Sequence, residues 1–163
     1  MTRAYLSLGS NLEPQTHLRA ALQELRQRFG DVAVSPTYRF AAVGFTGPDF
    51  LNLAVGIETD LEAPALDAWL HALEDRHGRR RDVPRYSSRT LDVDIVLFGD
   101  QVIDGHGHLQ VPRKELQESF VLQPLADIAP DVMHPTLKRT IAELWQAAAV
   151  ANRTAGVAVD LPG

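Results

Sequence analysis

Two aspartates, Asp92 and Asp94, interrupt an otherwise aliphatic run that extends from Leu91 to Phe98. The run contains β-branched residues and neither glycine nor proline, so it predicts a β-strand. Residues i and i+2 of a strand point to the same face, with Cα atoms about 6.6–7 Å apart. Two carboxylates on one face repel each other and lose hydration, which indicates a bound cation, Mg²⁺ first. The alternative is an exposed sheet face on which both carboxylates are hydrated.

An arginine-rich segment leads directly into this strand. Its members are Arg76, Arg79, Arg80, Arg81, Arg85 and Arg89. Guanidinium groups beside metal-binding carboxylates are suited to hold a polyphosphate and to stabilise charge that develops during its transfer. A run of arginines can equally be a solvated surface or an interaction patch. Because Arg89 stands just before the aspartates in the sequence, at least this side chain is expected near them.

Composition restricts the class of protein. With 163 residues, 45% hydrophobic and 23% charged, the chain suits one domain, 1–163, with a loosely attached tail after about residue 152. A net charge of −5 argues against nucleic-acid binding, and the absence of cysteine excludes disulfides and thiolate metal sites. No signal-peptide pattern and no apolar stretch of about 18 residues is evident. We therefore expect a cytoplasmic monomer that does not contact membranes.

Hydrophobic periodicity predicts the order βαββαβ, followed by further elements. Pro36 weakens the middle of the second strand, and residues 120–128 are ambiguous between helix and coil. The order predicts an α+β, ferredoxin-like core with a mainly antiparallel sheet, helices packed on it, and an extra C-terminal hairpin and helices. The expected strands are 4–8, 32–38, 50–59 and 91–98, and the expected helices are 14–29, 64–76 and 137–150.

Phe50 and Asn52 form a further candidate site on the third expected strand. Strand alternation puts both on one face, while Leu51 and Leu53 face the other side. A buried asparagine must satisfy its amide, and a hydrogen bond to nearby backbone is the common solution. The alternative is that the amide binds the edge of a polar heterocycle stacked on Phe50. The pattern alone leaves both open.

Six blocks of this sequence resemble the 6-hydroxymethyl-7,8-dihydropterin pyrophosphokinase family. The likeness extends from residue 3 to about 145, and its most specific part is Arg-Thr-Leu-Asp-Val-Asp-Ile at 89–95. The resemblance implies Mg²⁺-dependent transfer of diphosphate from ATP to the pterin's hydroxymethyl group, with release of AMP, in folate biosynthesis. The blocks are 8–12, 49–52, 78–79, 88–95, 120–125 and 128–131.

The resemblance also implies roles for individual residues. Asp92 and Asp94 would bind two Mg²⁺ ions and, with Arg79 and Arg89, form the catalytic set. Phe50 and Phe120 would sandwich the pterin ring. The full set of implied pterin-binding residues is Val43, Gly44, Phe50, Asn52 and Phe120. The implied ATP-binding residues are Glu74, Arg79, Arg81, Arg85, Arg89 and Ile95.

The chain departs from the family pattern in three places. Ser87-Ser88 replaces a pair that usually begins with glycine, Arg113 replaces a histidine after Pro112, and Glu118-Ser119 precede Phe120 where an arginine is usual. Arg113 or Lys114 is our candidate to replace the two nucleotide contacts that these departures remove. These departures motivate an alternative function, a diverged relative that binds pterin or nucleotide without transfer. A ferredoxin-like RNA-binding module is disfavoured by the net charge and by the lack of an aromatic-basic sheet motif.

Overall fold

The structure, a computed structural model, describes residues 1–42, 45–78, 88–105, 109–150 and 155–161. Its strands are β1 (Thr2–Ser10), β2 (Ala33–Val34), β3 (Thr37–Phe40), β4 (Phe50–Thr59), β5 (Asp92–Phe98), β6 (Ile103–Asp104), β7 (Gln110–Val111) and β8 (Val157–Val159). Its helices are α1 (Pro14–Phe29), α2 (Ala63–Arg76), the short 3-10 helix η1 (Lys114–Gln117), α3 (Ser119–Ile128) and α4 (Ile141–Val150).

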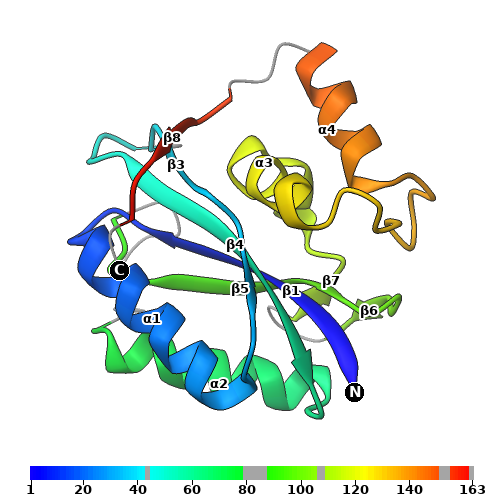
Figure 1. The fold of residues 1–163 in the computed structure, drawn as a ribbon, viewed down its shortest axis with the longest axis horizontal. Helices are drawn as coiled ribbons and strands as arrows, with labels where there is room; N and C mark the ends of the chain where they lie inside the picture. The colour runs from blue at the N-terminus through cyan, green and yellow to red at the C-terminus, as the bar shows by residue number, and fades with distance from the viewer. Residues whose placement is uncertain (43–44, 79–87, 106–108, 151–154, 162–163) are drawn as a thin grey trace.

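The main sheet is antiparallel, with the strand order β5-β1-β4-β3-β8, and β2 pairs with β4 beside β3 (Figure 1). The connection order β1-α1-β2/β3-β4-α2-β5 gives the ferredoxin-like arrangement in which the first strand lies inside the sheet. A separate two-stranded hairpin, β6-β7, follows β5. The predicted α+β, ferredoxin-like fold with an extra hairpin and helices is confirmed.

Helices α1 and α2 cover one face of the sheet (Figure 1). Their stripes of leucine, for example Leu25 and Leu70, are fully buried against it. The helix α1 ends as predicted at Gly30, whose φ of 79° is readily adopted only by glycine and whose N–H donates to Arg26 O. The strand residues buried on this face are Leu6, Leu8, Leu51, Leu53, Val55, Ile57, Val93 and Ile95.

Helices α3 and α4 pack on the opposite face, where they cover only part of the sheet (Figure 1). The strand residues of this second core are Tyr5, Ala54, Val96 and Leu97, and Leu122 of α3 belongs to the same cluster. Since Asn52 is two residues from Ala54 along β4, it lies on the same face beyond the apolar cluster. The second face is thus divided into an apolar part and a polar part.

The expected second strand is split in the structure. β2 ends at Val34 and β3 begins at Thr37, because Pro36 has no N–H to donate to the ladder. Ser35 takes over the pairing at the break: its N–H donates to Ala54 O at 2.9 Å, and its hydroxyl accepts from Ala54 N–H at 2.8 Å. The backbone N–H and C=O of Ala54 in β4 therefore keep their hydrogen bonds, although the chain changes direction at the break.

Three further expectations need correction or completion. Residues 120–128, left ambiguous above, are helical as part of α3. The last helix begins at Ile141, later than expected, because Thr140 and Glu143 form a reciprocal N-terminal cap. The tail after about 152 is not simply loose, because Val157–Val159 pair with β3 as β8. None of the described helices combines the length and the apolar character needed to cross a membrane.

Candidate active site

A polar strip, made of Ser7, Asn52, Asp92 and Asp94, crosses the sheet on its α3 face. In the strand register, Ser7 of β1 pairs with Asp94 of β5, and Gly9 of β1 lies between Asp92 on one side and Asn52 on the other. Directly paired residues have Cβ atoms about 4.5–5.5 Å apart and point to the same face. The sequence prediction that the two aspartates share a sheet face is therefore met.

The environment of Asp94 is unfavourable for its charge. Burial, first, and then the neighbouring charge of Asp92 raise the pKa of Asp94 well above its usual range. Glu74 and Glu115 add to the rise, whereas the guanidinium of Arg113 opposes it. The ionised form of a partly buried carboxylate beside a second carboxylate is destabilised, and Arg113 balances this only in part. This part of the sheet is thus prepared for a positively charged ligand.

Arg113 contacts one of the two aspartates, Asp94. Its Nη2 lies 3.4 Å from Asp94 Oδ1, and its Nε lies 3.2 Å from Glu115 Oε2. The residue is brought there by the β6-β7 hairpin and by a hydrogen bond from its own N–H to Val96 O, at 3.0 Å, on the outer edge of β5. Arg113 stands where the family pattern has a histidine, and the structure puts it within reach of the candidate metal site.

Glu74 and Ile95 are buried away from the polar strip. The Glu74 side chain, on α2, has 2% exposure, and its Oε2 accepts the N–H of Val93 at 2.8 Å. Since β5 is an edge strand in the described sheet, this carboxylate satisfies an amide that has no partner strand. Ile95 belongs to the core beneath α1 and α2. Their expected contacts with nucleotide stay predictions, and the structure gives each of them a structural role.

Asn11 connects three segments around the start of β5. Its Oδ1 accepts the N–H of Arg89 at 2.7 Å, while its Nδ2 donates to Pro48 O at 3.0 Å and to Ser88 Oγ at 3.2 Å. The N–H groups of Asn11 and Leu12 both donate to Arg89 O. Arg89 is buried, with 8% exposure, and directly precedes the strand of the two aspartates. Its backbone is therefore fixed on both sides relative to them.

Phe50 and Asn52 are held together over Gly9. A Cβ atom on Gly9 would lie 2.6 Å from Asn52 Nδ2 and 3.8 Å from the Phe50 ring, so the glycine makes room for both side chains. Asn52 is 5% exposed, and its Oδ1 is buried with no hydrogen-bond partner among the described residues. A second ring, Phe45, meets Phe50 edge-on at 6.3 Å. Among the described residues no backbone group pairs with this oxygen, so both alternatives for Asn52 stay predictions.

Phe120 lies in the first turn of α3, half-buried against the second core. The helix begins after η1, so the hairpin that carries Arg113 also sets the start of α3. Five predicted site residues lie outside the described part of the chain, and their positions stay predictions. They are Val43, Gly44, Arg79, Arg81 and Arg85.

The sequence reasoning did not assign a role to Gly9, Asn11, Phe45 or Glu115. The expected strand ended at residue 8, whereas β1 extends to Ser10 and so places Gly9 inside the sheet, opposite Asn52. The contacts of Asn11 join segments far apart in the chain, whereas Glu115 pairs with Arg113 two residues before it and only the fold brings both near Asp94. They become visible only when the loops are placed in space.

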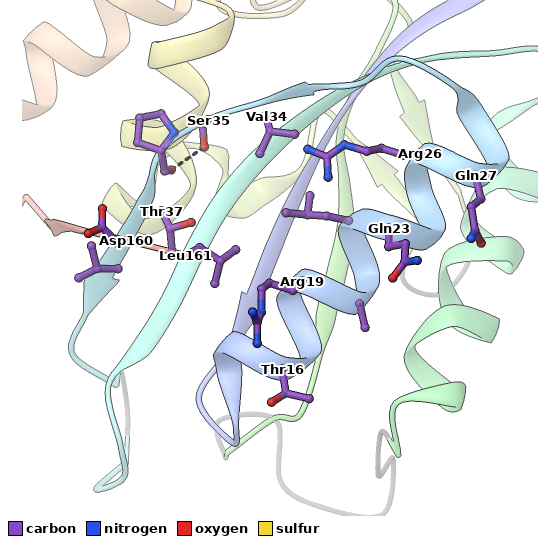
Figure 2. A pocket seen from close by; sticks show the side chains of 14 residues that line it. Thr16, Arg19, Gln23, Arg26, Gln27, Val34, Ser35, Thr37, Asp160 and Leu161 are labelled. Atoms are coloured by element: carbon purple, nitrogen blue, oxygen red, sulfur yellow. Dashed lines mark hydrogen bonds between the residues drawn. The ribbon is translucent and has the colours of Figure 1, made fainter. Parts of the chain in front are cut away.

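A large groove lies elsewhere on the molecule. It has a volume of about 1050 Å³ and lies between α1 and the segment that runs from β2 to β3, with the C-terminal residues at one end (Figure 2). Thr16 and Gln23 of α1 line one wall, and Thr37 and Leu161 line the other. None of the predicted site residues that the structure describes lines this groove, so its size alone does not make it the active site.

Comparisons with known proteins agree on one family. The family model for 7,8-dihydro-6-hydroxymethylpterin-pyrophosphokinase (HPPK) matches residues 5–130. The 2-amino-4-hydroxy-6-hydroxymethyldihydropteridine pyrophosphokinase of Pseudomonas aeruginosa is 43% identical over 139 residues, covering 82% of this chain and 84% of that protein. The protein of the same name from Bacillus subtilis is 39% identical over 134 residues, covering 79% of each.

Solved structures support the fold. The crystal structure of wild-type Plasmodium falciparum HPPK-DHPS superposes with a TM-score of 0.71 at 13% identity, covering 91% of this chain and 45% of that one. At this identity the likeness concerns the fold alone. Fold, polar strip and relatives together define a diphosphate-transferring enzyme, a pyrophosphokinase. More particularly, the chain belongs to the 7,8-dihydro-6-hydroxymethylpterin-pyrophosphokinase family, whose place is in folate biosynthesis.

Proposed function

We propose that this chain transfers the β,γ-diphosphate of ATP to the hydroxymethyl oxygen of 6-hydroxymethyl-7,8-dihydropterin, releasing AMP, and that the polar strip is where it does so. The observation that carries the assignment to this site is the arrangement around Gly9. Asp92 and Asn52 are its neighbours on either side, so a candidate cation site and a candidate heterocycle site adjoin on one sheet face. A reaction between a polyphosphate and a pterin needs both sites at this separation.

The carboxylates of this strip fit magnesium. Among the described residues, no group of three or more histidine, cysteine, aspartate or glutamate side chains is suited to hold a metal ion. Two carboxylates with a raised pKa at one of them are nevertheless what Mg²⁺ commonly uses, because it takes its remaining ligands from water and phosphate oxygens. When bound, magnesium would neutralise charge on the phosphates. We propose two ions, held by Asp92 and Asp94.

The arginines act on the other side of the phosphates. Arg89, fixed through Asn11, and Arg113, now paired with Asp94 and Glu115, are the described candidates. We propose that Arg113 leaves Asp94 and binds phosphate when nucleotide and cation are present. Arg79, Arg81 and Arg85 are proposed to complete the phosphate site, and Arg79 and Arg89 to stabilise the charge that develops in the transfer.

The pterin ring is proposed to stack between Phe50 and Phe120, with Asn52 binding its polar edge. The support is the buried Asn52 Oδ1, which lacks a partner among the described residues and would accept a hydrogen bond from the ring. Val43 and Gly44 are proposed to complete this pocket through their backbone. The protein's own contribution to rate is then orientation of the hydroxymethyl oxygen and the exclusion of water.

One assay tests the reaction. The protein is incubated with ATP, Mg²⁺ and 6-hydroxymethyl-7,8-dihydropterin, and AMP and pterin diphosphate are quantified. We expect both products in equal amounts. Binding of pterin or nucleotide without AMP would instead identify a non-catalytic relative and would overturn the proposed reaction. The monomeric and cytoplasmic state expected from the sequence is also a proposal, which light scattering and cell fractionation test.

Arg113 can be tested separately with Arg113→Ala and Arg113→Lys. We expect Arg113→Ala to raise the KM for ATP and Arg113→Lys to restore part of the affinity, because lysine keeps the charge but not the planar fork. Unchanged KM and turnover in Arg113→Ala would show that this residue does not replace the missing family contact.

A further inference from the structure

The C-terminal segment, residues 155–161, returns to the sheet beside the candidate pterin site. Within this segment, β8 pairs antiparallel with β3 at the edge of the sheet (Figure 1). The register pairs Thr37 with Val159 and Arg39 with Val157, so Gly156 is next in line opposite Phe40. Residues matched by the family model end at 130, so this segment is an addition to the part that defines the family.

A side-chain clamp fixes this segment to α3. The Gly156 N–H donates to Gln123 Oε1 at 2.6 Å, and Gln123 Nε2 donates to Gly156 O at 3.4 Å. One glutamine thus occupies both hydrogen-bonding groups of one backbone residue, as a neighbouring strand would. Gln123 is one turn after Phe120 in α3, and residues three apart lie side by side on a helix. The clamp therefore acts on the helical face that carries Phe120.

The same glycine touches the strand that supports Phe50. A Cβ atom on Gly156 would lie 2.6–2.8 Å from three atoms of the Phe40 ring, so the tail backbone lies directly on that ring. Phe40 in turn pairs with Phe50 across β3 and β4. Gly156, Phe40 and Phe50 therefore form one row across three neighbouring strand positions. If the tail were displaced, this row would be the route by which the movement reaches Phe50.

A second link runs parallel to the clamp. The Tyr38 hydroxyl of β3 donates to the Asp127 carboxylate of α3. Burial, together with this hydrogen bond, raises the pKa of Tyr38 to about 12. Phe120, Gln123 and Asp127 follow one another at helical spacing, so one stripe of α3 faces the β3-β8 edge. Both links hold α3 at a defined distance from the strands beneath it.

We propose that Gln123 and Gly156 are positioning residues for the pterin: the docked C-terminal segment fixes α3 against β3 and β4 and so sets the separation of Phe120 and Phe50. The proposal rests on the proposed function, since it assumes that the ring stacks between these two side chains. Stacking requires a narrow range of ring separations, so a small movement of α3 weakens pterin binding while the aspartates on β5 stay in place.

A purely structural role is the competing explanation. Val159 and Leu161 pack on the edge of the main core, and Leu161 lines the groove beside α1 (Figure 2). Loss of this packing would reduce stability without preference for one substrate. The two explanations differ in the KM for pterin relative to the KM for ATP.

The test uses full-length variants Gln123→Leu, which keeps bulk but removes both hydrogen bonds, and Gly156→Ala, which forces a methyl group onto Phe40. We expect the KM for 6-hydroxymethyl-7,8-dihydropterin to rise about five- to tenfold in each, as expected for the loss of one or two neutral hydrogen bonds. Turnover and the KM for ATP should stay near the wild-type values. Phe40→Leu, which frees space above Gly156, should partly rescue Gly156→Ala.

Gln27→Leu on α1 is the matched control, because it makes the same change at an exposed helical glutamine far from α3, and it should alter neither KM. Unchanged pterin KM in Gln123→Leu, or an equal loss for both substrates, would overturn the inference. Should Gly156→Ala fail to fold, Gln123→Leu alone decides between these results. Absence of product from the wild-type enzyme would overturn the proposed function and this inference with it, whereas normal wild-type turnover with unaffected variants overturns only the inference.

Discussion

The two faces of the sheet are built from the same strands but have different roles. Beneath α1 and α2, residues such as Leu6, Leu53 and Ile57 have no exposed surface and no polar atoms to satisfy. On the α3 side, the sheet carries Asn52, whose Oδ1 has no hydrogen-bond partner among the described residues, and Asp94, whose pKa is raised by burial and by Asp92. Alternate strand residues face opposite ways. One face can therefore be optimised for stability, while the other carries polar groups whose environment is energetically unfavourable until ligands bind.

The difference between the faces also shows in how they are covered. Two long helices seal the leucine face, whereas α3 and α4 cover the other face only as far as Tyr5 and Ala54. The polar strip begins where this cover ends. Substitutions on the leucine face should therefore alter stability first, and substitutions on the polar strip should alter activity first. Five experiments test whether stability and activity are divided between the two faces in this way.

The largest effect is expected for Asp92→Asn. Activity should fall about a thousandfold or more, because the cation site loses one of its two carboxylates. Without Mg²⁺, the melting temperature should stay the same or rise, since repulsion from Asp94 is relieved. AMP formation and thermal unfolding measure the two quantities. A large loss of melting temperature in the metal-free variant would show that the aspartate pair stabilises the fold. That result would contradict the expectation that the polar strip affects activity first.

On the leucine face, Leu53→Ala should behave in the opposite manner. Leu53 is fully buried, so its truncation should lower the free energy of unfolding by about 2–5 kcal/mol. Turnover per folded molecule should stay close to the wild-type value. Denaturant unfolding and AMP formation at a temperature well below the transition provide both numbers. A selective rise in either KM would mean that the two faces are more tightly coupled than their packing indicates.

Gly9→Ala tests the centre of the polar strip. Its methyl group would meet Asn52 Nδ2 at 2.6 Å and displace the amide, so the KM for pterin should rise about tenfold while the KM for ATP changes little. Gly56→Ala is the matched control, because it lies opposite Tyr5 on the same sheet face but within the apolar part. Loss of stability alone is expected there, and an equal effect of both changes on pterin KM would argue against the role of Asn52.

The pH dependence of stability should reveal Asp94. Burial and Asp92 raise its pKa above the ordinary value of 3.8, so the folded protein takes up a proton that the unfolded chain releases. Its contribution favours folding below that ordinary value and is lost as pH rises through the raised pKa. Without Mg²⁺, the stability of Asp94→Asn relative to wild type should therefore increase with pH. Denaturant titrations across this window measure the difference, and a flat profile would contradict it.

The smallest effect is expected for Tyr38→Phe. It removes the hydrogen bond to Asp127, a partly exposed contact that should contribute about 0.5 kcal/mol. The change in denaturation midpoint should accordingly be small, and the pterin KM should rise less than in Gln123→Leu. A rise in pterin KM larger than that in Gln123→Leu would show that the Tyr38–Asp127 pair, and not the C-terminal segment, is the main connection between α3 and the sheet.

Much of the fold could be predicted from local pattern. The helix at 14–29 begins and ends where proline, leucine spacing and Gly30 predict, and the strand at 50–59 has the predicted bounds. Two boundaries differ for local reasons: Pro36 splits the second strand, at the position where it was expected to weaken it, and the Thr140–Glu143 cap delays the last helix to Ile141. Prediction failed altogether where a distant contact decides the outcome. The tail gains its strand only because the edge of β3 is available.

The sequence by itself determined the chemistry of this protein: Asp92 and Asp94 share a face because strand alternation is local, and the block at 89–95 indicates the family. Only the tertiary structure decided which groups meet that face. Arg113, which follows the β6-β7 hairpin, contacts Asp94. Asn52 of β4 lies over Gly9 of β1, and the Glu74 carboxylate of α2 accepts the N–H of Val93 on β5. The physical reason is that each such contact joins residues distant in the chain, whose approach is fixed by the packing of whole elements.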